Sequence, residues 1–102
     1  MFVQHRAEFV FSKTGKMKYI SHLDLMRLFM RALRRAELPV MISQGFNPHP
    51  KISLQNALKL GAESDNELAK VVLHRLVAGA DFQERLQSQL PQGILIRKVE
   101  VI

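Results

Sequence analysis

Residues 19–51 read YISHLDLMRLFMRALRRAELPVMISQGFNPHPK, and this stretch decides the fold. Apolar residues recur in it at helical spacing, which predicts a helix from Ser21 to about Ala36. Ser21 is the expected N-cap, with Asp24 three residues later in an aspartate version of the capping box. Pro39 ends the helix, because the residue before a proline avoids helical geometry. The expected buried stripe consists of Leu25, Phe29, Ala32, Leu33 and Ala36.

The chain around this helix is rich in short runs of strand-forming residues. Residues 6–12 predict a strand with Ala7, Phe9 and Phe11 on one face, because side chains alternate along a strand. Residues 17–20 either extend that strand or lead into the helix. Further strands are expected over 40–43, 51–54, 67–77 and 94–102, with a polar connection over 56–66. A second helix is expected to start with a capping-box signal at Asp81 and to bury Phe82, Leu86 and Leu90.

The order of these elements predicts an α+β fold of the ferredoxin-like type, the split βαβ topology written βαββαβ. This interpretation counts residues 51–54 and 67–77 as one bent strand, whereas taken separately they add a strand. In either case an antiparallel sheet carries two helices on one face. The length of 102 residues predicts a single domain over residues 1–102. A final strand that runs to the last residue is compatible with the N-terminal half of a longer protein.

Composition excludes several classes of site. The chain has no cysteine, which removes disulfides, thiolate catalysis and cysteine-ligated zinc or iron–sulfur sites. No apolar run approaches the roughly 20 residues of a membrane helix, and the start lacks the apolar segment of a signal peptide. We therefore expect a cytoplasmic location and no membrane partner. Walker loops, GxGxxG segments, nucleophile elbows and the paired strand aromatics of RRM domains are also absent.

The net charge of +6 is concentrated in the first part of the chain. Residues 1–60 hold ten Lys/Arg against three Asp/Glu, whereas residues 61–102 hold five against six. This distribution indicates a face suited to an anionic partner, and RNA is the commonest such partner for a small cytoplasmic domain. The alternatives are a solvated basic surface and a dock for an acidic protein.

The predicted helix also carries a cationic stripe. Its members are Arg27, Arg31, Arg34 and Arg35. A stripe of this kind contacts phosphates in nucleic-acid-binding proteins, and it also occurs as an exposed face that only keeps a helix soluble. Met26 and Met30 lie off the buried stripe, so we expect another element or another protein chain to cover that side.

The loop over residues 44–51 is dense in residues that fix the backbone. Gly45 permits a positive φ, and Pro48 and Pro50 hold the residues before them in extended geometry. A loop ordered in advance loses little entropy on binding. The side chains that it offers to a phosphate, a base or a carboxylate are Phe46, Asn47, His49 and Lys51. The alternative is a rigid turn between strands with Phe46 in the core.

His22 and Asp24 lie in the first turn of the predicted helix. The helix dipole and free backbone N–H groups favour Asp24 there, and His22 fits a buried, hydrogen-bonded role. The alternatives for His22 are a general base, a ligand contact, and a metal ligand together with Asp24 and His49. We expect the helix start and the loop over residues 44–51 to converge in one positively charged pocket.

Several of these motifs resemble those of the radical-SAM-linked domain, a bacterial family without an assigned reaction. The resemblance runs from Ala7 to Ile102, and the chain is similar to the N-terminal half of longer family members. The matching motifs are Ser21-His22-Leu23-Asp24, Arg27, Arg34-Arg35, Gln44-Gly45-Phe46-Asn47-Pro48-His49-Pro50-Lys51, Leu60-Gly61, Glu63-Ser64 and Leu90-Pro91-Gln92-Gly93.

The resemblance implies a companion of a radical SAM protein, either fused to it or encoded beside it. That partner would bring an iron–sulfur cluster and S-adenosylmethionine, while this chain would hold no cofactor. The gene neighbourhood of the family implies an RNA or ribosome-related substrate, with tRNA or rRNA as a second partner.

The expected function is therefore an accessory RNA-binding or substrate-binding module that is not an enzyme on its own. Its expected contact residues are His22, Asp24, Arg27, Arg31, Arg34, Arg35, Phe46, Asn47, His49 and Lys51. One alternative is a small RNA-processing or RNA-modifying enzyme that uses His22 or His49 as acid–base. The other is a pure protein-docking domain that uses the side of the helix with Met26 and Met30.

Overall fold

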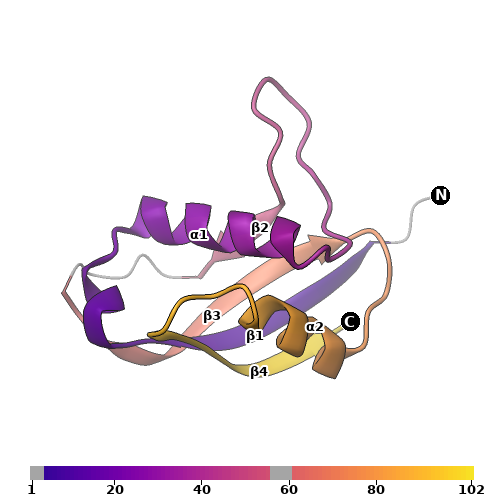
Figure 1. Ribbon diagram of the computed structural model, residues 1–102. Coiled ribbons are helices and arrows are strands. Elements are labelled where there is room, and N and C mark those ends of the chain that lie inside the picture. The colour runs from indigo at the N-terminus through magenta and orange to yellow at the C-terminus, as the bar shows by residue number, and fades with distance from the viewer. Residues whose placement is uncertain (1–3, 56–60) are drawn as a thin grey trace.

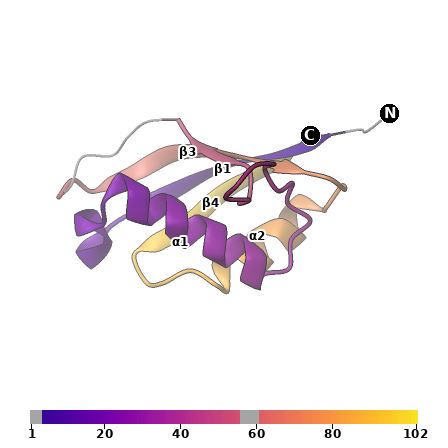
Figure 2. The same cartoon turned by 90° about the horizontal axis from the view of Figure 1, so that it is seen from above.

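The computed structural model describes residues 4–55 and 61–102. Its elements are β1 (His5–Lys13), a 3-10 helix η1 (Gly15–Tyr19), α1 (His22–Arg35), β2 (Ile52–Leu54), β3 (Ser64–Leu73), α2 (Gly79–Gln87) and β4 (Ile94–Val101). Within these ranges the strands form one antiparallel sheet in the order β2-β3-β1-β4, with α1 and α2 on one face (Figure 1, Figure 2). The predicted α+β fold of the ferredoxin-like type is confirmed. Neither of these helices is long and apolar enough to cross a membrane.

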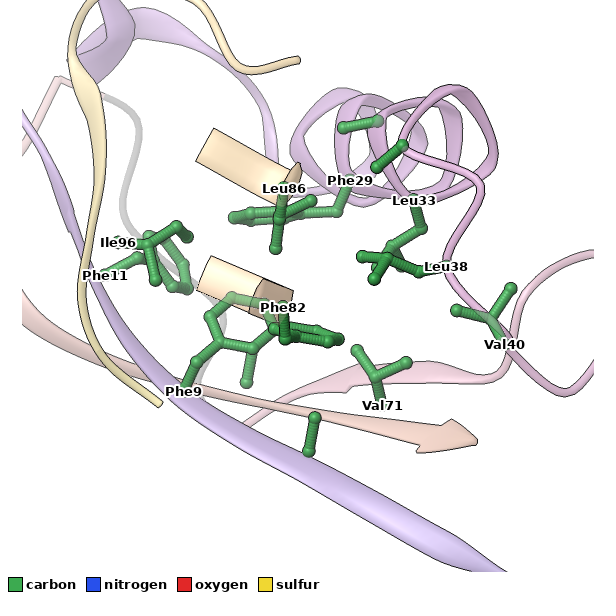
Figure 3. Packing of buried hydrophobic residues seen from close by; sticks show 14 of the residues in the cluster. Phe9, Phe11, Phe29, Leu33, Leu38, Val40, Val71, Phe82, Leu86 and Ile96 are labelled. Atoms are coloured by element: carbon green, nitrogen blue, oxygen red, sulfur yellow. The ribbon is translucent and has the colours of Figure 1, made fainter. Parts of the chain in front are cut away.

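The core lies between the sheet and the two helices and is built around phenylalanine rings. Alternation along β1 turns Phe9 and Phe11 toward the helices, and each is 1% exposed. Phe29 of α1 packs against both rings, with its centroid 5.6 Å from Phe9 and 4.9 Å from Phe11. Phe82 of α2 lies 5.9 Å from Phe9 (Figure 3). Phe9 therefore joins both helices to the sheet, and each ring pair adds about 1 kcal/mol beyond its buried area.

The start of α1 agrees with the sequence. Ser21 is the N-cap, and its Oγ accepts a hydrogen bond from the Asp24 N–H at 3.1 Å. The expected buried stripe is confirmed, since each of its five members is at most 8% exposed. The helical period alone therefore places the apolar side of α1 on the sheet.

The segment before α1 is a 3-10 helix, so residues 17–20 do not extend β1. Met17 of η1 packs closely on Gly93, which has a φ of 101°. A Cβ at Gly93 would lie 2.6 Å from Met17 Cγ and 2.7 Å from the carbonyl oxygen of Thr14. This contact therefore requires a glycine before β4.

α1 ends at Arg35, before it reaches Pro39, in a turn of the Schellman type. The Glu37 N–H donates to the Arg34 carbonyl at 3.0 Å, and the Leu38 N–H donates to the Leu33 carbonyl at 3.3 Å. Glu37 has a φ of 56°, in the left-handed region that this turn usually fills with glycine. The end of α1 therefore depends on an unfavourable conformation of one residue.

A side chain of α2 supports this turn. Arg85 Nη2 donates to the carbonyl oxygen of Ala36 at 2.8 Å and to that of Glu37. The Arg85 guanidinium also lies 3.2 Å from the carboxylate of Asp81. The expectation that Asp81 caps α2 is wrong, because α2 begins at Gly79 and has no side-chain cap.

Residues 40–43, which the sequence predicts as a strand, do not form one. Val40 makes only an isolated bridge with Leu73, and Ile42 makes one with Pro50. Part of this segment therefore pairs with a residue only eight positions later in the chain, as Ile42 does with Pro50.

The sheet edge beside β3 is shared by Val40 and β2. Val40 faces Leu73, and Ile52 faces Val71 two residues away on the same strand, both antiparallel. Residues 41–51 lie between these two contacts and form a hairpin, which we call the 41–51 hairpin. It projects from the sheet beside the C-terminal end of α1 (Figure 1).

β3 begins earlier and ends earlier than predicted, at Ser64–Leu73 instead of 67–77. Residues 64–66, assigned to the polar connection over 56–66, belong to this strand, and residues 56–60 lie outside the described ranges. β2 and β3 are separate strands that pair with each other. The inward-facing residues of this strand are each 0% exposed: Ala69, Val71 and Leu73.

Side chains of α2 bond the outer edge of β4. Gln87 Nε2 donates to the Ile94 carbonyl at 3.0 Å, and Gln87 Oε1 accepts from the Ile96 N–H at 2.7 Å. Gln83 Nε2 donates to the Ile96 carbonyl at 3.0 Å. These two amides occupy backbone groups that would otherwise be open to a further strand.

Candidate nucleic-acid interface

α1 carries four arginines on the side turned away from the sheet. They are Arg27, Arg31, Arg34 and Arg35, and all are exposed. Because a helix turns about 100° per residue, the four lie within an arc of about 100°, opposite the buried stripe. We call this surface the arginine face.

Most of the charge on the arginine face is not neutralised. Arg27 Nη1 lies 3.5 Å from Asp24 Oδ1, but these side chains are 62% and 61% exposed, so the ion pair is weak. The side chains of Arg31 and Arg35 make no hydrogen bond or ion pair with any residue in 4–55 or 61–102. The face is therefore suited to an anionic partner.

The 41–51 hairpin is anchored to the arginine face. Arg34 Nη2 donates to the Pro48 carbonyl at 3.2 Å. Inside the hairpin, the Ser43 N–H donates to the His49 carbonyl at 2.8 Å, and the His49 N–H donates to Ser43 Oγ at 3.2 Å. Phe46 at the tip is fully exposed, so the alternative that placed its ring in the core is wrong.

The helix start and the hairpin do not meet. The hairpin contacts Arg34, which lies twelve residues after His22 in α1, a distance of about 18 Å along the axis. The expected single pocket is therefore wrong (Figure 1). His22 and Asp24 do not share a metal site with His49, and the part of the chain that the structure describes has no group of three metal-binding side chains.

At the helix start, each residue has a local environment. His22 is partly buried, and its Nδ1 atom has no hydrogen-bond partner among the described residues. The hydrogen-bonded role expected for His22 is thus not found at that atom. Asp24 bonds Ser21 through its N–H and pairs with Arg27 through its carboxylate, so its visible role is structural.

A second basic surface lies on the open face of the sheet, away from the helices. It is a groove of about 380 Å³, which we call the sheet-face groove. The residues that line it include Arg6, His49, Lys51, Ser53, Lys70 and Val72. The sequence pointed to His49 and Lys51 but missed Arg6 and Lys70. The alternation of side chains along a strand could have identified them, because Arg6 and Lys70 each directly precede a buried residue and so point to the open face.

The comparison with known proteins gives one positive finding. No curated protein has a significant sequence match to this chain. Residues 6–102, nearly the whole chain, match the model of the family described as "Uncharacterized protein conserved in bacteria (DUF2344)", and the chain therefore belongs to that family.

Proposed function

We propose that this chain is an RNA-binding accessory domain whose contact surface is the arginine face together with the 41–51 hairpin. One observation carries the proposal: exposed arginines on one side of α1 stand next to a hairpin that presents a fully exposed Phe46. Arginines contact phosphates, and an exposed ring stacks on an unpaired base. Their combination favours single-stranded or looped RNA over a regular duplex.

The charge on the arginine face supports phosphate contact. Among the described residues, Asp24 is the carboxylate paired with this face, and its ion pair is with Arg27. For a single strand, each neutralised phosphate contributes about −0.7 to the slope of log affinity against log salt. One phosphate for each of the four arginines gives an expected slope of about −2.8.

The hairpin supports base contact. Its hydrogen bond from Arg34 to Pro48 holds the tip beside the arginine face, so that one strand can reach both. Phe46 supplies a stacking surface worth about 1–3 kcal/mol per base. Asn47, exposed next to it, supplies an amide that can donate to and accept from a base edge.

We further propose that the domain works beside a radical SAM protein in RNA or ribosome-related modification. The motif resemblance supports this pairing. Because this sequence has no cysteine to ligate an iron–sulfur cluster, the partner in this proposal would bring the cluster and S-adenosylmethionine. In this arrangement the domain holds tRNA or rRNA while the partner performs the chemistry. Co-purification from the native cells tests the pairing. Recovery of RNA without a radical SAM protein would refute the proposed radical SAM partner and leave the RNA-binding proposal standing.

Filter binding of tRNA and rRNA fragments across a salt series tests the RNA proposal. Arg31→Ala with Arg35→Ala should reduce the salt slope by about 1.4 and weaken binding at low salt by about tenfold or more. The control, Lys16→Ala with Arg97→Ala, removes the same charge from exposed positions in η1 and β4. It should leave the affinity within about twofold. No binding at low salt, or equal losses in both double variants, would refute the proposal.

A further inference from the structure

We propose that the sheet-face groove is a binding site for the phosphate-bearing unit of a nucleotide. This site is separate from the arginine face, because its strand residues alternate with residues buried under the helices and so lie on the opposite side of the sheet from α1. It does not depend on the RNA proposal and is tested by different variants.

The register of the sheet builds the groove. Arg6 of β1 faces Val72 of β3, and Ser53 of β2 faces Lys70 of β3. The neighbouring pair Ala7–Val71 is completely buried under the helices. Side chains alternate along a strand, so the Arg6, Ser53, Lys70 and Val72 side chains share the open face.

The base of the hairpin completes the groove. The Lys51 N–H donates to the Met41 carbonyl at 2.8 Å, and the Lys51 carbonyl accepts from the Val72 N–H at 3.0 Å. These two bonds fix the backbone of Lys51 against the end of β3. Lys51 and His49 therefore line the groove from the side opposite Arg6.

The positive charges in the groove favour binding of an anion. Arg6, Lys51 and Lys70 are exposed cations that line one space. Glu8 Oε1 lies 3.8 Å from Lys70 Nζ, a partly exposed and weak pair that offsets one of the three charges. Arg6 and Lys51 have no ion pair with any residue that the structure describes. A phosphate dianion matches the two charges that stay uncompensated.

His49 adds a feature that a bare anion does not use. Its Nδ1 lies 3.1 Å from the Pro50 carbonyl oxygen. A carbonyl only accepts, so in this contact Nδ1 carries the hydrogen. Nε2 of the neutral ring is then an acceptor, and a ribose hydroxyl is a suitable donor to it.

The size and lining of the groove select a small ligand. A volume of about 380 Å³ is near the lower end of the roughly 300–1,000 Å³ of ligand sites. Val72 supplies an apolar wall, and none of the lining residues within 4–55 and 61–102 is aromatic. The predicted contacts are therefore to the phosphate and the sugar, with no stacking on the base.

A free nucleotide and the 5′-terminal nucleotide of an RNA share this chemistry. Amide chemical shifts of the whole chain, recorded during titration with AMP and with adenosine, test the site. A short oligonucleotide with a 5′-phosphate and the same oligonucleotide with a 5′-hydroxyl distinguish the two sources. AMP or the 5′-phosphorylated strand should move the amides of Arg6, Lys51, Ser53, Lys70 and Val72, whereas adenosine and the 5′-hydroxyl strand should leave them in place.

Ser53 gives the most discriminating pair of variants, because it is an exposed lining residue of the groove that faces Lys70. Ser53→Glu places a carboxylate among the cations and should weaken binding of the phosphorylated probe by about tenfold or more. Ser53→Gln has nearly the same shape without the charge and should stay within about twofold. Arg31→Ala with Arg35→Ala should not change AMP binding, which separates this result from the RNA test.

Three outcomes would overturn the proposal. One is the absence of shifts with both phosphorylated probes, and another is a set of shifts confined to α1. The third is equal binding by Ser53→Glu and Ser53→Gln.

Discussion

The two ends of α1 are held in different ways. At the N-terminal end, Ser21 and Asp24 form a cap from residues three apart. At the C-terminal end, Glu37 adopts a left-handed conformation, and Arg85 reaches its turn from 48 residues further along the chain. The first end is a local structure, whereas the second exists only in the folded domain. The hairpin and the cluster of Arg34 and Arg35 lie at this second end, so the candidate RNA surface depends on tertiary structure.

The largest effect on this comparison is expected from Arg85→Ala. The change removes the hydrogen bonds to the Ala36 and Glu37 carbonyls and should lower the free energy of unfolding by about 2 kcal/mol. Urea denaturation measures the loss. Arg97→Ala, at an exposed position of β4, is the control, with an expected change below about 0.5 kcal/mol. Similar losses in both variants would mean that Arg85 does not support the turn.

Ser21→Ala tests the local end. Loss of the hydrogen bond from Asp24 N–H to Ser21 Oγ should reduce the free energy of unfolding by about 1 kcal/mol. Ser21→Asp keeps a side-chain acceptor and should retain most of the stability. If the aspartate variant is as unstable as the alanine variant, the cap contributes nothing.

Glu37→Gly should have a smaller effect of opposite sign. A non-glycine residue in the left-handed region costs about 1–2 kcal/mol, and part of that gain is offset by the greater freedom of glycine in the unfolded chain. We expect a net stabilisation of about 0.5 kcal/mol, seen as a higher melting temperature. Arg35→Gly, two residues earlier in the helix, should lower the melting temperature instead. A lower melting temperature for Glu37→Gly would show that the turn is not strained.

Phe46→Ala should have almost no effect on stability, because the ring is fully exposed. The free energy of unfolding is expected to change by less than about 0.5 kcal/mol. RNA affinity should fall by about tenfold, as loss of one stacked base predicts. Phe46→Tyr keeps a flat ring and should bind normally. Unchanged RNA binding by the alanine variant would remove the hairpin tip from the proposed interface.

What the sequence predicts well is set by short-range periodicity. The buried stripe of α1 and the alternation of Ala7, Phe9 and Phe11 follow directly from helical and strand spacing. Residues 40–43 are predicted as a strand because the β-branched side chains of Val40 and Ile42 suit a strand whatever segment it pairs with. The sequence does not reveal that Ile42 pairs with Pro50 inside a hairpin.

The candidate sites divide along the same line. The arginine face is predictable, since one helical period brings all four arginines together. The sheet-face groove is not, because it requires the register that sets Arg6 opposite Val72 and Lys70 opposite Ser53. The prediction that His22 and the hairpin share a pocket is wrong for a related reason. Nearness in the sequence does not show which end of α1 the following loop packs against.

The glutamine contacts of α2 have a consequence for self-association. An unpaired strand edge is where identical chains add to one another and start to aggregate. Gln83 and Gln87 occupy the backbone groups of Ile94 and Ile96 on one border of the sheet, and β2, on the other border, is only three residues long. Addition of a further strand at Ile94 and Ile96 is therefore disfavoured, and the short β2 offers few backbone groups for such pairing on the other border.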